Sequence, residues 1–150
     1  MTYLDTSALV KRYVKEEGSE IVGSLFATEE RLITAKIAYA EALAAFCRRR
    51  REGYLAEKDY ASLCQRFESE WEAYIDVVEL TDRVLKDTRR LIDNYPLRGS
   101  DAIHLASALL IKNRVKGEFT FLCSDRNLLD AAGKEDLNTA NPEEMGSKEI

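Results

Sequence analysis

The chain has 150 residues, of which 45% are hydrophobic and 33% are charged, and its formal net charge is −5 at pH 7. This composition excludes a disordered or collagen-like chain, and the length suits one folded domain. No apolar run approaches the roughly 18 residues that a membrane-spanning helix needs, and the first residues lack the basic and apolar segments of a signal peptide.

The first part of the chain predicts two strands and two helices. Thr2–Leu4 is a short apolar run that suits a buried strand. A helix is expected over 8–17, because Ser7 can cap its first turn, and Ser19 can cap a second helix. The apolar residues 32–34 predict the next strand.

Two long helices and a strand follow. Residues 36–52 are rich in Ala and Leu and end before Gly53, which is typical of a helix. In residues 55–74 the large apolar side chains recur at helical spacing. Residues 75–80 predict a strand. The two helices are long enough to form an antiparallel hairpin beside the sheet.

The last part of the chain alternates again between helices and strands. Caps and apolar spacing predict three helices, over 82–95, 101–115 and 126–132, and two strands, over 119–123 and 137–139. This alternation predicts an α/β fold with three layers, in which helices flank a mainly parallel sheet of about five short strands. Residues 1–142 are expected to form a single domain, and residues 143–150 a polar C-terminal tail.

Four acidic residues fall at the ends of predicted strands or at the starts of helices. Asp5 and Asp125 each come just after a strand. Asp101 follows Ser100 at a helix start, and Glu41 lies in the first turns of a helix. In a parallel sheet these positions share one edge, where open α/β folds bind ligands. We therefore expect the four carboxylates to meet in one pocket.

Such a cluster has a chemical use. Close anions repel one another, and at least one takes up a proton unless a cation enters. Hard divalent ions such as Mg²⁺ or Mn²⁺ prefer oxygen ligands, lower the pKa of bound water and neutralise charge that develops on a phosphodiester. The pattern favours a metal-dependent nuclease. The alternative is that each acid only begins a turn or complements a helix dipole.

Four segments resemble the motifs of PIN-domain ribonucleases. They are residues 3–9 (YLDTSAL), 39–43 (YAEAL), 100–106 (SDAIHLA) and 121–128 (FLCSDRNL). Their order and spacing match that family over nearly the whole chain. The subgroup that the chain resembles is the VapC-like toxins of type II toxin–antitoxin operons.

The resemblance implies a PIN-like fold and an endoribonuclease that depends on Mg²⁺ or Mn²⁺. Asp5 and Asp101 would be the principal metal ligands. Glu41 and Asp125 would hold the metal or its waters, or position the attacking water. The hydroxyl of Ser7 would support this acidic centre.

The resemblance also implies partners. VapC-like toxins are usually homodimers, and an antitoxin inhibits them by placing its tail in a groove near the acidic centre. The substrate would be RNA. The chain departs from the family at one position: Cys123 stands two residues before the fourth acid, where Ser or Thr is frequent.

Basic residues supply candidates for binding RNA. Arg48–Arg51 cover all sides of a helix turn, so the four cannot all face one ligand. They predict phosphate contacts, a solvated helix end whose charges offset the helix dipole, or a contact with an acidic partner or a second copy. Arg48 and Arg98 are the candidates for RNA binding, and Arg98 lies just before the third motif.

Two further features have competing interpretations. His104, the only histidine, follows Asp101 by three residues on the same helix face. Such a residue is more often a packing residue with a satisfied hydrogen bond than a general base. Phe67, Trp71 and Tyr74 share a helix face, which favours a hydrophobic contact over a platform for stacked bases.

The three cysteines are widely spaced and form no C-x-x-C pair, which is typical of buried thiols in a reducing compartment, so we expect a cytoplasmic protein. The alternative function is a catalytically silent PIN-like interaction module. Retention of all four acids argues against it, because their mutual repulsion has no other use. Chemistry through an aspartyl-phosphate fits poorly, because a second acid is missing at Ser7.

Overall fold

The computed structural model describes residues 1–146 and contains a five-stranded sheet. The strands are β1 (Thr2–Leu4), β2 (Leu32–Ala35), β3 (Ile75–Val78), β4 (Thr120–Leu122) and β5 (Asn138–Ala140). Their order is β3-β2-β1-β4-β5, and every neighbouring pair is parallel. The expected parallel α/β architecture is therefore confirmed.

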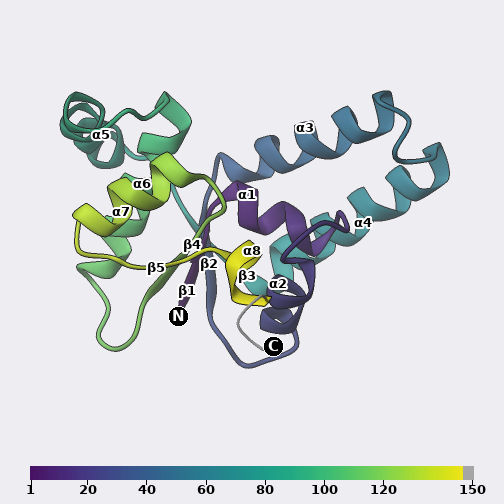
Figure 1. Cartoon of the computed structure of the whole chain (residues 1–150), viewed down its shortest axis with the longest axis horizontal. Helices are drawn as coiled ribbons and strands as arrows, with labels where there is room; N and C mark the ends of the chain where they lie inside the picture. Colours follow the sequence, from purple (N-terminus) through teal and green to yellow (C-terminus); the bar gives the residue numbers. More distant parts are fainter. Residues whose placement is uncertain (147–150) are drawn as a thin grey trace.

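Helices cover both faces of the sheet (Figure 1). On one side lie α5 (Asp82–Asn94), α6 (Gly99–Lys112) and α7 (Arg126–Lys134); on the other lie α1 (Thr6–Leu9), α2 (Ser19–Phe26), α3 (Ala38–Arg51) and α4 (Glu57–Tyr74). The short helix α8 (Pro142–Met145) follows β5. Two neighbouring parallel strands must be joined by a crossover connection, and the helices of each crossover pack on one face of the sheet.

Alternation along the strands produces two hydrophobic cores. Tyr3, at 0% exposed, packs towards α5, α6 and α7, and its ring stacks on Phe121 with 5.3 Å between the centroids. The next residue, Leu4, belongs to the second core, with Phe46 of α3 and Phe67 of α4. Successive side chains of a strand point to opposite faces, so both faces of this sheet are buried.

The α3–α4 pair forms the predicted hairpin, which projects beside the sheet in Figure 1. Phe67 is fully buried against Phe46 and Tyr13, at centroid distances of 5.5 and 5.2 Å. Trp71 is partly buried, and Tyr74 is 62% exposed. Phe67 and Trp71 thus contribute to a contact face inside the hairpin, as the spacing indicated, whereas Tyr74 faces solvent.

Several helix starts differ from the sequence-based expectations. Asp5 rather than Ser7 caps the first helix, which gives way to a 3-10 turn over Val10–Arg12 instead of continuing to residue 17. Gly18 rather than Ser19 is the N-cap of α2, because the Ser19 hydroxyl accepts from the Glu16 amide (2.9 Å). Short polar side chains can bond neighbouring backbone groups in several ways, so the sequence alone does not fix the cap.

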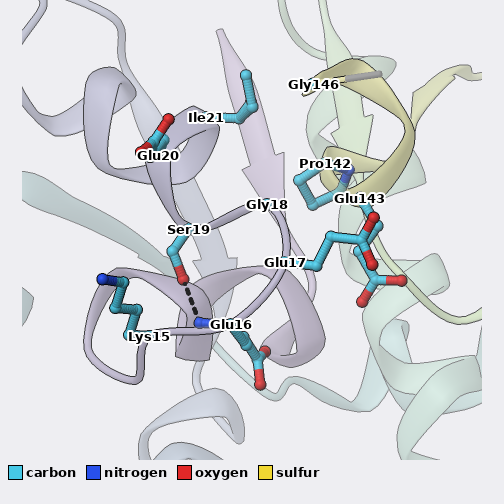
Figure 2. A pocket seen from close by; sticks show the side chains of 10 residues that line it. All are labelled: Lys15, Glu16, Glu17, Gly18, Ser19, Glu20, Ile21, Pro142, Glu143 and Gly146. Atoms are coloured by element: carbon cyan, nitrogen blue, oxygen red, sulfur yellow. Dashed lines mark hydrogen bonds between the residues drawn. The ribbon is translucent and has the colours of Figure 1, made fainter.

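The C-terminal segment differs from the polar tail expected over 143–150. Residues 142–145 form α8, which lies beside Gly18 in Figure 2; residues 147–150 lie outside the described part of the chain. Gly18 has φ +88°, and a Cβ there would lie 2.9 Å from the carbonyl carbon of Pro142, so only glycine permits this approach. The buried Lys11 also bonds Glu143 (2.8 Å). These contacts order the start of the segment.

The described residues include no helix that is both long and apolar enough to cross a membrane.

Candidate active site

A cavity of 370 Å³ opens at the carboxyl edge of the sheet, and most of the residues that line it are polar. It is lined by Asp5, Thr6, Ser7, Val10, Glu41, Ala45, Arg48, Arg98, Ser100, Asp101 and Asp125. All four candidate acids, Ser7 and both candidate RNA-binding arginines are therefore brought together. We call this the acidic cavity.

Asp5 follows β1 and is only 5% exposed. Its amide donates to the carbonyl of Leu122 (3.0 Å), which fixes the end of β1 against β4. Its Oδ2 accepts from the Ser7 amide (3.2 Å) and the Ser7 hydroxyl (2.7 Å), and so caps α1. The first acid is thus held by the turn that it begins.

Ser7 and Cys123 connect the first and fourth motifs. The Ser7 hydroxyl accepts from the Ser124 amide (3.0 Å). The buried Cys123 Sγ lies 3.4 Å from Asp5 Oδ2 and accepts from the Asp125 amide (3.2 Å). Burial, together with the charge of Asp5, raises the pKa of the Cys123 thiol, so the sulfur is a neutral hydrogen-bonding group here.

Asp125 and Asp101 are both engaged at helix starts. Asp125 caps α7, and its Oδ1 accepts from the Leu128 amide (3.0 Å). Asp101 Oδ2 accepts from the amide (3.2 Å) and the Nε (3.3 Å) of Arg98, which is the N-cap of α6 in place of the expected Ser100. The hydrogen bond to Asp101 raises the pKa of Arg98, so its charge stays beside the cavity.

Glu41 is held by two residues from other elements. Its Oε1 accepts from the Thr6 hydroxyl (2.8 Å) and lies 2.8 Å from His104 Nε2. Burial opposes the charged form of Glu41, but the hydrogen bond and charge of His104, the hydrogen bond of Thr6 and the charge of Arg98 together outweigh burial and lower the pKa of this carboxyl. Thr6 was not identified from the sequence as a site residue; its only signal was its position beside Asp5.

His104 lies just behind the acidic cavity and is 1% exposed. Its Nδ1 is 2.9 Å from the Tyr3 hydroxyl, and its Nε2 is 3.0 Å from Thr6 Oγ1 and 3.5 Å from Asp5 Oδ1. Burial disfavours the imidazolium, but the neighbouring charges of Asp5 and Glu41 raise the pKa of His104 overall. The structure matches the packing interpretation of a buried histidine with satisfied hydrogen bonds.

The hydrogen bonds of the four acids leave part of each carboxylate available. In the described residues these bonds fall on a single oxygen each: Oδ2 of Asp5, Oε1 of Glu41, Oδ2 of Asp101 and Oδ1 of Asp125. The donor set is all oxygen, which is the chemistry that Mg²⁺ and Mn²⁺ prefer. Within residues 1–146, no three His, Cys, Asp or Glu side chains are arranged to hold a metal ion.

The structure distinguishes the four consecutive arginines. Arg48 lines the acidic cavity. Arg49 pairs with Glu16 (2.7 Å), and Arg50 pairs with Glu57 (3.2 Å) and lies over the ring of Tyr60. Two of the four therefore have structural partners, and Arg48 is the one beside the carboxylates.

Comparisons with known proteins identify the family of the chain. A family model described as the PIN domain matches residues 2–134. Two curated proteins of Mycobacterium tuberculosis, Ribonuclease VapC45 and Ribonuclease VapC49, are each 35% identical over 111 residues, which span 74% of this chain and 76% of each relative.

Solved structures share the fold. FitAcB from Neisseria gonorrhoeae superposes with a TM-score of 0.68 at 17% identity, covering 97% of this chain and 100% of that chain. A toxin–antitoxin complex from Klebsiella pneumoniae has a TM-score of 0.66 at 15% identity, covering 95% of this chain and 98% of that chain. With its motifs, sheet order and matched length, the chain belongs to the PIN-domain family.

Proposed function

We propose that this protein is the toxin of a toxin–antitoxin pair and hydrolyses RNA phosphodiesters as a divalent-metal-dependent endoribonuclease. The observation that carries the proposal is the acidic cavity, where four carboxylates from distant parts of the chain meet. The curated relatives that are 35% identical are named as ribonucleases.

The four acids would hold Mg²⁺ or Mn²⁺. Asp5 and Asp101 would be its principal ligands, and Glu41 and Asp125 would bind the metal or its waters. When bound, the ion lowers the pKa of water and neutralises charge on the phosphodiester. Asp101 Oδ2 accepts from the amide and the Nε of Arg98, so Asp101 would offer its other oxygen, Oδ1, to the metal.

The remaining polar residues would prepare and hold the substrate. Ser7 fixes Asp5 Oδ2 with a 2.7 Å hydrogen bond, so the carboxylate keeps its direction. Arg98 and Arg48 line the cavity and would contact RNA phosphates, which guanidinium groups bind well.

The proposal extends to partners and compartment. The matched structure from Klebsiella pneumoniae is a toxin–antitoxin complex. By this likeness we propose an antitoxin partner that inhibits the enzyme near the acidic cavity, a homodimer, a cytoplasmic location, and residues 1–142 as the catalytic domain.

The experiment is cleavage of structured RNA by purified protein with Mg²⁺, with Mn²⁺ and with EDTA, beside the Asp5→Asn variant. We expect cleavage that needs the metal and is lost in the variant. Absence of cleavage on every RNA offered, together with absence of metal binding by calorimetry, would contradict the proposal and favour a silent PIN-like interaction module.

A further inference from the structure

Glu41 is more exposed than Asp5 and Asp101, two of the other acids that are proposed to bind the metal, yet it is held from its buried side. Its side chain is 33% exposed, whereas that of Asp5 is 7% exposed and that of Asp101 is 14% exposed. A glutamate has three rotatable side-chain bonds, and ordering such a chain costs conformational entropy. Something must therefore set the direction of this carboxylate before a metal arrives.

His104 is placed to set it. The ring comes from α6, which also carries Asp101, and its Nε2 lies 2.8 Å from Oε1 of Glu41 on α3. The same nitrogen is 3.5 Å from Asp5 Oδ1. One buried imidazole thus bridges two acids from separate elements, and a donor between two anions also reduces their repulsion.

The imidazole itself cannot turn freely. Its Nδ1 is 2.9 Å from the hydroxyl of Tyr3, and the two rings meet edge to face at 6.0 Å between the centroids. Tyr3 is 0% exposed and stacks on Phe121. The orientation of His104 is therefore fixed by the packed core between β1 and α6.

Thr6 completes the arrangement from a third element. Its hydroxyl donates to the same Oε1 of Glu41 (2.8 Å) and lies 3.0 Å from His104 Nε2. Both hydrogen bonds of the Glu41 carboxylate in the described residues fall on Oε1. Oε2 is therefore the oxygen left for a ligand in the acidic cavity.

We propose that Tyr3, His104 and Thr6 form a positioning network that locks Oε1 of Glu41 and leaves Oε2 to the metal ion or its water. The inference rests on the proposed metal-dependent function. Tyr3 and His104 act through Glu41 and touch neither substrate nor metal. Partners of this kind orient ligands in metal sites, and their loss typically costs 10- to 100-fold in metal affinity or activity.

The first test is calorimetric titration of Mn²⁺ into wild type and the variants His104→Asn, Tyr3→Phe and Thr6→Val. We expect affinity to fall roughly 10- to 100-fold for His104→Asn and by smaller factors for the other two. The matched control is Tyr95→Phe, which removes the hydroxyl of a partly buried tyrosine that donates to Glu135 (2.5 Å). The Mn²⁺ affinity of this variant should equal that of wild type. If His104→Asn does not fold, the other two variants carry the test.

Two further readouts separate positioning from packing. In cleavage assays kcat should fall and KM should stay near the wild-type value, because the network does not touch RNA. Since the chain has one histidine, ¹⁵N-histidine labelling yields a single pair of ring signals in NMR spectra. These spectra are recorded with diamagnetic Mg²⁺ in place of Mn²⁺. Addition of Mg²⁺ should shift the Nε2 signal more than the Nδ1 signal.

The outcomes are distinguishable. A wild type that binds metal, with all three variants binding within twofold of it, would overturn the positioning network and leave the proposed function standing. A wild type that binds no metal would overturn both. Variants that lose stability in urea but keep full metal affinity and kcat would reduce the network to packing.

Discussion

Two cavities in this chain are each lined by four acidic residues, yet they differ in how those acids are neutralised. The acidic cavity holds Asp5, Glu41, Asp101 and Asp125. A second cavity, of 500 Å³, lies between the start of α2 and α8 (Figure 2) and holds Glu16, Glu17, Glu20 and Glu143. We call it the glutamate cavity.

Two of the four acids in the glutamate cavity, Glu16 and Glu143, are paired with cations. Lys11, at 3% exposed, bonds both Glu16 (3.0 Å) and Glu143 (2.8 Å). Arg49 adds a second cation to Glu16 (2.7 Å). Three of the four acids also come from one short stretch of sequence. Both features are typical of an ion-pair cluster that fastens α8 to the rest of the fold.

The acidic cavity draws its four acids from four separate elements and neutralises them differently. Asp101 pairs with Arg98, but the other three are held mainly by hydroxyl, amide, thiol and imidazole groups. The comparison shows that acid count does not identify a site. Two features are more useful for recognising a candidate metal site. The acids come together from distant parts of the sequence, and some of their carboxylate oxygens are not paired with a Lys or Arg side chain.

The largest expected effect is on catalysis. Asp5→Asn should reduce RNA cleavage by about 1,000-fold, because several kcal/mol of transition-state stabilisation depend on the metal. Asparagine keeps the helix cap, so the fold should remain. The matched change in the glutamate cavity, Glu20→Gln, should leave the cleavage rate unchanged. Equal losses in both variants would remove the distinction between the cavities.

The increase in thermal stability on metal binding should also distinguish the two cavities. At a metal concentration about 100 times Kd, binding adds roughly 2.7 kcal/mol to stability, which for a chain of this size raises Tm by about 5–10 °C. Differential scanning calorimetry with and without Mg²⁺ measures it. Asp101→Asn should lose most of the shift and Glu143→Gln should keep it; the reverse result would place the ion in the glutamate cavity.

Lys11→Met should lower the free energy of unfolding by about 1–3 kcal/mol, since it leaves two glutamates without their shared cation. The value is below that of a fully buried pair because Glu143 is 39% exposed. Urea denaturation measures the change. Cleavage per folded molecule should be unaffected, and a variant as stable as wild type would show that the cluster does not fasten α8.

The smallest effects concern RNA binding. Arg98→Gln and Arg48→Gln, each in the Asp5→Asn background, should reduce the slope of log K against log salt by about 0.7, as expected for loss of one phosphate contact on a single strand. Arg50→Gln is the control, because Arg50 pairs with Glu57 and, unlike Arg48 and Arg98, does not line the acidic cavity. Fluorescence anisotropy with labelled RNA gives the slopes. Equal slopes for all three variants would exclude Arg98 and Arg48 from the RNA path.

The central strands of the sheet were predictable because β1, β2 and β4 are short and mostly apolar segments between polar turns and helices. In β1, for example, Tyr3 packs into the core on one face of the sheet and Leu4 into the core on the other. Because both faces are buried, successive residues of the strand are apolar. Helix boundaries were less predictable. The segment after Asp5 forms one helical turn and a 3-10 turn, and Asp5 rather than Ser7 caps it. Capping depends on side-chain geometry that spacing does not fix.

The positions of the four acids followed from the parallel sheet, since strand ends share an edge. Their partners did not follow. The contact between His104 and Glu41 spans 63 positions, and that between Tyr3 and His104 spans 101. Helical spacing says nothing about which distant side chains meet across the fold. The structure was needed to show that the lone histidine supports an acid.

The most direct test of the account is RNA cleavage with Mn²⁺ at one protein concentration for wild type, Asp101→Asn and Glu20→Gln, each checked for folding by circular dichroism. The account predicts cleavage by wild type and Glu20→Gln at the same rate, and its loss in Asp101→Asn and on addition of EDTA. Cleavage by a folded Asp101→Asn variant at the wild-type rate would contradict the claim that the acidic cavity is the catalytic centre.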